Sequence, residues 1–127
     1  MASRSDITSI GDIQLLIDSF YQKIKADDTV GYIFNDIANV NWEHHLPKMY
    51  AFWEYLLLGG ENYSGNPIEP HIRLRQKVEL TKEHFDRWVA LFTQNVDEHF
   101  EGTNAEEAKN KARLIAITWM TKLTRNL

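Results

Sequence analysis

Apolar residues recur at intervals of three and four along almost the whole of this 127-residue chain, and this spacing restricts the fold more than any other feature. Side chains three and four apart lie on one face of an α-helix, whereas a half-buried strand needs alternation, and no alternating segment competes. We therefore expect an all-α protein of four long helices with some short ones. Domains usually hold about 100–150 residues, so we expect a single domain over residues 1–127, with a flexible lead over about residues 1–9.

The first two long helices are bounded by an acidic residue, a proline and a glycine pair. The first follows Asp12, which we take as its cap, and ends at Asp27-Asp28; a short helical piece follows at residues 30–34. The second contains Pro47, and proline is tolerated in a first helical turn, where backbone N–H groups are unpaired anyway. We expect its regular part to start near residues 43–45, after a looser turn at Trp42, and to end at Gly59-Gly60.

The second half of the chain is predicted as a loop over residues 59–70, a short helix that carries His71 and Leu74, and two long helices. The first of these follows Thr81 as cap and ends at Gly102. The second opens with Thr103 and Glu106 at the spacing of a capping box. The apolar faces of the four long helices are Ile13, Leu16, Ile17, Phe20, Tyr21 and Ile24; Trp42, His45, Met49, Phe52, Trp53 and Leu56; Phe85, Trp88, Phe92, Val96 and Phe100; and Ala108, Ala112, Ile115, Ala116, Trp119 and Leu123.

The composition excludes several classes of function. Cysteine is absent, which rules out disulfides, thiolate metal sites, iron–sulfur clusters and cysteine nucleophiles. The formal net charge of −4 argues against binding to a phosphate backbone, so we expect no nucleic-acid partner. No apolar run approaches the roughly 20 residues needed to span a bilayer, and the N-terminus lacks the apolar core of a signal peptide. We expect a cytoplasmic protein with no membrane contact.

Five histidines are present, but none has the spacing of a metal site made wholly of side chains. A haem needs only one strong ligand from the protein, because the porphyrin itself supplies four nitrogens to the iron. The protein must also provide an apolar slot. His71 is the best placed candidate, since it begins a short helix after a proline and shares a face with Leu74. The alternative is a surface histidine beside a loop. The 6 Phe, 5 Tyr and 4 Trp supply candidate walls for such a slot.

Three further residues carry a polar group on an apolar stripe. The Tyr21 hydroxyl and the Trp88 indole N–H are donors that either face a bound ligand or are satisfied by a backbone carbonyl. His45 either points inward or is a core-edge histidine bonded to a backbone carbonyl. His44 is one step round the helix and more exposed, and we interpret His84 and His99 as surface residues at the ends of the third long helix.

Several of these residues occur together in one order and spacing. They are Phe20-Tyr21, Phe34, the run HLPKM at 45–49, Phe52-Trp53, His71 and the run FDRWVALF at 85–92, extended by Trp42, YSGNP at 63–67 and Asn95-Val96-Asp97. From about residue 10 onward the chain resembles the bacterial truncated haemoglobins, and within them the third group. Other groups of that family carry glycine pairs before and after the distal helix. Here only Gly59-Gly60 remains, and Pro47 stands near the start of that helix.

The resemblance implies a truncated globin fold, in which helices pack two over two around a haem b. The proximal iron ligand falls on His71, the distal tyrosine on Tyr21 and the tryptophan that faces the bound gas on Trp88. The gate-like distal histidine falls on His45, with His44 as the alternative at a shift of one residue. The phenylalanine wedged against the porphyrin falls on Phe34.

We expect the remaining haem contacts on the apolar stripes and beside His71. They are Met49, Phe52, Trp53, Leu74, Phe85 and Phe92. Met49 takes a position that is often another aliphatic, which changes the pocket size slightly. Lys48, Arg73 and Arg75 are candidate partners of the haem propionates, and ordinary solvated charge is the alternative for each.

The implied function is that of a haem protein which binds O2, NO or CO at a pentacoordinate-type iron. Two donors beside the negatively polarised oxygen imply slow O2 release, which suits redox chemistry better than transport. Nitric-oxide dioxygenation or a peroxidase-like reaction fits this, with a reductase that the sequence does not name. The alternatives are gas storage or sensing without turnover and, more remotely, a helical interaction module with no cofactor.

Overall fold

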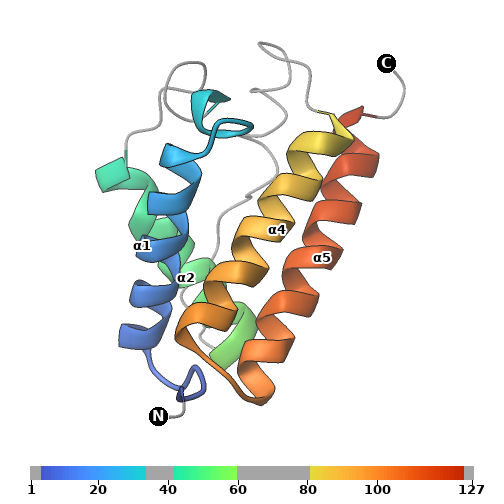
Figure 1. The fold of residues 1–127 in the computed structure, drawn as a ribbon. Helices are drawn as coiled ribbons and strands as arrows, with labels where there is room; N and C mark the ends of the chain where they lie inside the picture. The colour runs from blue at the N-terminus through green and yellow to red at the C-terminus, as the bar shows by residue number, and fades with distance from the viewer. Residues whose placement is uncertain (1–3, 34–41, 60–80, 125–127) are drawn as a thin grey trace.

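The computed structural model describes residues 4–33, 42–59 and 81–124, apart from the side chains of residues 119 and 121–124 (Figure 1). These ranges contain four long α-helices and no strand: α1 (Ile10–Ala26), α2 (Trp42–Leu58), α4 (Lys82–His99) and α5 (Thr103–Thr124). Helix α1 packs on α2, α4 packs on α5, and α1 and α2 also contact the second pair. The predicted all-α class is confirmed. No helix in these ranges is both long enough and apolar enough to cross a membrane.

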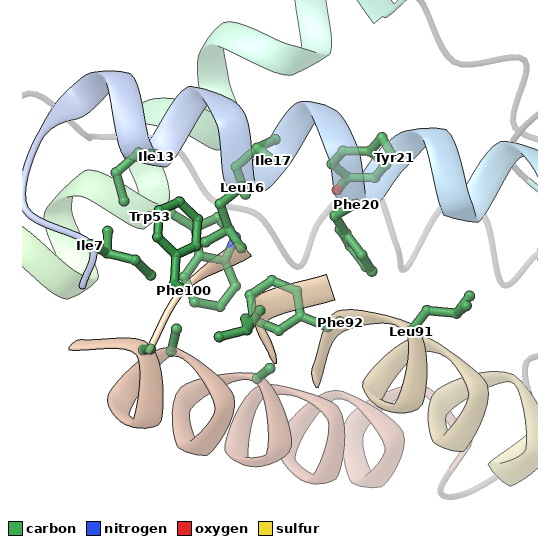
Figure 2. Close-up of a cluster of buried hydrophobic side chains, with 14 of the residues drawn as sticks. Ile7, Ile13, Leu16, Ile17, Phe20, Tyr21, Trp53, Leu91, Phe92 and Phe100 are labelled. Carbon is green, nitrogen blue, oxygen red and sulfur yellow. The ribbon is translucent and has the colours of Figure 1, made fainter. Parts of the chain in front are cut away.

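The core is built from the predicted stripe of α1 and from the facing sides of the other helices (Figure 2). All six residues of the α1 stripe are buried. Leu16 and Phe20 point from α1 toward α4, where Phe92 is 0% exposed. Burying a side chain of this size stabilises a fold by about 1.5–3 kcal/mol, so this seam holds the two helix pairs together.

One polar side chain lies inside the described core. Asn95 on α4 is 0% exposed, and its Nδ2 donates to the carbonyl oxygen of Leu16 on α1 at 2.9 Å. Its Oδ1 has no hydrogen-bond partner among the described residues. A buried amide that donates to a fixed backbone carbonyl sets the height of α4 against α1, because sliding either helix would leave the buried Asn95 amide without this partner.

The first helix begins three residues before the place that the sequence suggested. Ser9, not Asp12, is the cap: its Oγ accepts from the backbone N–H of Asp12 at 3.2 Å, and the Asp12 carboxylate accepts from the N–H of Thr8 at 2.9 Å. Ser9 and Asp12 thus satisfy donors reciprocally, in the manner of a capping box. The predicted end at Asp27 is correct, since its backbone N–H bonds to Ile24 and its carboxylate accepts from Thr29 and Val30.

Helix α2 also begins earlier than expected, at Trp42, so Pro47 is its sixth residue. The first four N–H groups of a helix have no partner within it, and the fifth belongs to Leu46. Residue 47 would make the second internal bond, to the carbonyl of Glu43, and that is the one bond the proline removes. The predicted end is correct, because the helix stops at Leu58 and Gly59 follows with a φ of +76°.

Helix α4 starts as predicted after Thr81, whose Oγ1 accepts from the N–H of His84. The His84 imidazole returns the bond, since its Nδ1 accepts from the Thr81 N–H at 3.0 Å. The helix ends at His99 rather than at Gly102, because Phe100 adopts an extended conformation and closes it as cap. Gly102 lies in the following turn with a φ of +136°.

The start of α5 is capped by a residue from the other end of the chain. Both oxygens of the Asp6 carboxylate accept backbone N–H bonds, from Asn104 at 2.9 Å and from Ala105 at 2.8 Å. The Asn104 side chain donates back to the carbonyl of Ile7, which is 0% exposed. Asp6 therefore does the capping that the sequence suggested for Thr103 and Glu106. This contact places Asp6 and Ile7 within the folded unit, where the sequence suggested a flexible lead.

We predict that Asp6→Ala lowers the free energy of unfolding by about 0.5–2 kcal/mol, the usual loss for an acidic N-cap. Burial opposes ionisation of Asp6, but hydrogen bonds from the backbone N–H groups of Asn104, Ile7 and Ala105 outweigh it and hold its pKa below the usual value. A lowered carboxyl pKa stabilises the fold above about pH 3.9, and this stability is lost as the pH falls through the lower folded-state value.

Urea titrations of Asp6→Ala and the parent protein between pH 3 and 7 measure this effect. The gap between their unfolding free energies should be constant near neutrality and shrink in acid. The exposed Asp28→Asn is the control for a lost surface charge. A gap that persists at pH 3 would show that the cap does not depend on the charged carboxylate.

Candidate functional site

Tyr21 is the polar group at the meeting point of α1, α2 and α4. It is 8% exposed, and its ring is tilted against the rings of Phe20 and Trp42 and edge-on to that of His45, with centroid distances of 5.1, 5.0 and 5.5 Å. Its hydroxyl oxygen lies 3.4 Å from Nε2 of His45, at the long end of the hydrogen-bond range. The structure thus brings together two of the three predicted distal residues.

Burial also determines the charge state of Tyr21. Removal from water disfavours the phenolate and raises the pKa of the hydroxyl far above its usual range. The group is therefore a neutral phenol at any physiological pH, with one hydrogen to donate and lone pairs to accept. A neutral donor in an apolar environment is suited to a polar ligand that carries partial negative charge.

The Tyr21–His45 contact has two hydrogen arrangements. Either the phenol donates to Nε2, or the imidazole carries its proton on Nε2 and donates to the phenol oxygen. In the second arrangement Tyr21 accepts from His45 and its own hydrogen points to another partner. His45 therefore decides in which direction the phenol donates.

Trp88, the third predicted distal residue, comes from α4 and is half-buried. Its ring stacks on Phe92 at 5.7 Å and meets the edge of Phe20 at 5.6 Å. Phe92 in turn stacks on Trp53 at 4.8 Å, so Trp88 ends a row of rings that runs through the core. Packing on both sides restricts the indole to one orientation.

An apolar wall continues along α2 from His45. It consists of Met49, Phe52 and Leu56, which follow His45 at helical spacing, pack against the core and stay partly exposed. Trp88 of α4 and Ile115 of α5 also pack against the core and stay partly exposed. Trp53 and Phe92, predicted as haem contacts, are 4% and 0% exposed. Their burial places both rings in the core, and their contact with a haem stays a prediction.

Phe85 lies one turn before Trp88 on α4. It lines a groove of about 240 Å³ between α4 and α5, together with Asp86, Val89, Arg113, Ala116, Ile117 and Met120. Lys48 is exposed on α2, and His44 is exposed beside His45. The Nδ1 of His84 accepts from the N–H of Thr81 at the cap of α4, and its Nε2 lies 3.3 Å from the Tyr32 hydroxyl.

The other predicted site residues lie outside the described ranges. They are the proximal candidate His71 and the pocket candidates Phe34, Leu74, Arg73 and Arg75. Within the described ranges no three histidine or acidic side chains form a group that would hold a metal ion.

The sequence did not single out Trp42 and Lys25 as parts of the site. Trp42 contacts both Tyr21 and His45, and the Lys25 ammonium lies 4.9 Å from the centroid of the Trp42 ring. The signal for Trp42 was its spacing of three from His45, which places both on one face of a helix. No pattern in the sequence indicates the Lys25 contact, because it joins two helices.

Comparison with known proteins gives consistent matches. A family model described as bacterial-like globin matches residues 7–123. The chain is 32% identical over 118 residues to the group 3 truncated hemoglobin of Campylobacter jejuni, covering 87% of each chain. It is 31% identical over 75 residues to the group 1 truncated hemoglobin GlbN of Synechocystis, covering 58% of each. The crystal structure of the group III truncated hemoglobin from Campylobacter jejuni superposes with a TM-score of 0.82 at 25% identity, covering 97% of both chains.

We predict that Tyr21 makes the fold sensitive to alkali. A tyrosine whose pKa is raised on folding keeps its proton in the folded state while the unfolded state loses it. Stability from this residue is therefore complete below about pH 10 and falls above it by about 1.4 kcal/mol per pH unit. Tyr21→Phe abolishes this loss.

Guanidinium titrations at pH 8, 10 and 11 measure the effect as the difference between parent and variant. Tyr50, whose pKa is raised to about 12 by burial and by the hydrogen bond and negative charge of Asp18, is present in both proteins and cancels in the difference. A parent-minus-variant difference that stays constant from pH 8 to 11 would show that the Tyr21 phenol is accessible to water.

Proposed function

This chain belongs to the bacterial-like globins, and we propose that it is a haem protein of the third truncated group that holds O2 tightly and turns it over in redox chemistry. Membership of the family implies haem-based gas binding. The predicted truncated globin fold is confirmed by the two-on-two packing of α1 and α2 against α4 and α5 and by the likeness to the group III structure. The relation between Tyr21 and His45 supports the finer proposal.

The described residues fit one side of a haem. The half-buried wall of Met49, Phe52 and Leu56 offers apolar surface to a flat ring, and the neutral phenol of Tyr21 contacts His45, one turn before Met49 on the same helix. When bound, haem b supplies an iron that takes O2, NO or CO as a small ligand. We propose His71 as its protein ligand, with Lys48 and Arg73 as partners for the propionates; His71 and Arg73 lie outside the described residues.

Tyr21 and Trp88 then act as donors toward a polar ligand. With His45 donating to its oxygen, the Tyr21 hydroxyl directs its own hydrogen into the pocket, and the packed Trp88 ring supplies a second N–H. Both groups favour O2, which is polarised when bound, over the less polar CO. Such donors slow the release of O2, and slow release favours reaction of the ligand over its delivery.

We infer that nitric-oxide dioxygenation or a peroxidase-like reaction follows, with electrons from a reductase. The alternative is storage or sensing of the gas without turnover. Repeated turnover distinguishes the two: each dioxygenation consumes one O2 and one NO, releases one nitrate and leaves ferric haem, so only a protein that an added electron donor returns to the ferrous state keeps consuming NO beyond one equivalent per haem.

We predict that His71→Gly abolishes stable haem binding. Loss of the single protein ligand leaves only apolar contacts, so the Soret band of the purified variant should disappear and return when imidazole is added. His99→Gly, at the end of α4, is the control and should retain a normal spectrum. Loss of the Soret band in His99→Gly together with a normal spectrum in His71→Gly would contradict the assignment.

We predict that Tyr21→Phe and Trp88→Phe each accelerate O2 dissociation by about ten- to a hundred-fold, the equivalent of about 1.5–3 kcal/mol for a hydrogen bond to a charged partner. Dissociation of CO should change much less. Trp88→Phe also loses about 1–3 kcal/mol of stability through the cavity it creates.

Stopped-flow measurements on the parent, both single variants and the double variant test this. The double variant should be non-additive, because the two donors share one ligand. An unchanged O2 off-rate in Tyr21→Phe would mean that the phenol serves only its contact with His45.

A further inference from the structure

The Tyr21–His45 pair is enclosed by a third ring. Trp42 lies in the same first turn of α2 as His45, and its ring centroid lies 5.7 Å from the imidazole and 5.0 Å from the phenol. The planes meet at 77° and 56°, so the indole is edge-on to the imidazole and tilted against the phenol, and it stacks on neither ring. His45 is thus bordered by Tyr21 and Trp42.

The Trp42 ring also contacts a charged side chain. The Lys25 ammonium lies 4.9 Å from the centroid of the Trp42 ring, within the range of a cation–π interaction. Lys25 belongs to the last turn of α1, whereas Trp42 opens α2, so this contact joins the helix that carries Tyr21 to the helix that carries His45. A cation also suits the C-terminal end of α1, where the helix dipole is negative.

The contacts of His45 determine what it must leave in order to move. The imidazole is half-buried near the start of α2, and swinging it away from the pocket breaks its 3.4 Å contact with Tyr21 and its edge contact with Trp42. When the Lys25 ammonium holds the Trp42 ring in place, the ring resists this motion of the imidazole. Without that contact, the Trp42 ring turns with the imidazole.

We propose that Trp42, held by the Lys25 ammonium, is a positioning residue that keeps the His45 imidazole against Tyr21 and so sets how fast small ligands enter the pocket. This rests on the proposed haem function, since it concerns access to that site. Trp42 acts through His45, with no contact to the ligand. At an exposed site a cation over an aromatic ring shifts an equilibrium by about two- to five-fold.

The test compares charge-removing and charge-preserving variants in the haem-loaded ferrous protein. Lys25→Met should raise the rate constant for CO association by about two- to five-fold, and Lys25→Arg should restore the parent rate. Lys23→Met is the matched control, since Lys23 lies two residues away and pairs with Glu98 on α4 at 2.8 Å. Trp42→Ala should accelerate association at least as much as Lys25→Met.

A second readout follows His45 itself. In the diamagnetic CO form with 15N-labelled histidine, exchange broadening of the His45 ring signals should increase in Lys25→Met but not in Lys23→Met. The His45→Ala variant should itself bind CO faster than the parent. In this background Lys25→Met should add no further acceleration, because Trp42 and Lys25 act through the His45 imidazole.

The outcomes separate this inference from the proposed function. A protein without a Soret band would refute both. A normal Soret band and an accelerated O2 off-rate in Tyr21→Phe, combined with unchanged CO association in Lys25→Met, would overturn the role of Trp42 alone. Altered His45 signals without a change in association would also overturn it, as would acceleration by Lys25→Met that persists in the His45→Ala background.

Discussion

The position of Phe92 is the constraint on which the rest of this structure depends. Its ring meets the edge of Phe20 from α1 at 5.0 Å, stacks on Trp53 from α2 at 4.8 Å and supports Trp88 one turn earlier on α4. One side chain therefore joins both helix pairs and orients the Trp88 ring. Because interiors are packed like crystals, a shift of Phe92 would be transmitted to Trp88 and, through Phe20, to Tyr21.

The sequence was most informative where a single helix determines the outcome. The six apolar residues of α1 are all buried, since the period of 3.6 residues alone decides which side of a helix faces the core. The helix ends at Asp27 and Leu58 were also predictable, because a carboxylate cap and a glycine pair act on neighbouring backbone groups. The residues that resemble a haem pocket include Tyr21 and His45, and the structure brings these two together.

The sequence was least informative where one helix depends on another part of the chain. Thr103 and Glu106 have the local pattern of a cap, yet Asp6 caps the first turn of α5 through the N–H groups of Asn104 and Ala105 from almost a hundred residues away, and a local pattern carries no information about such a competitor. Trp53 and Phe92, predicted as haem contacts, lie in the core, and apolar periodicity does not tell whether a core side chain also borders a cavity. The early start of α2 has a different cause: losing one hydrogen bond at Pro47 is less costly than leaving Trp42 out of its contacts with Tyr21 and His45.

The cap of α5 by Asp6 has a consequence for the order in which the chain becomes structured during synthesis. The segment around Asp6 emerges from the ribosome 98 residues before Asn104, the first residue whose backbone it binds. At about 5–20 residues per second, this segment waits on the order of 5–20 s before its partner exists, with the Ile7 side chain still in contact with water. The first turn of α5 is therefore capped by a segment made 98 residues earlier, so this part of the fold closes only after α5 has begun to be synthesised.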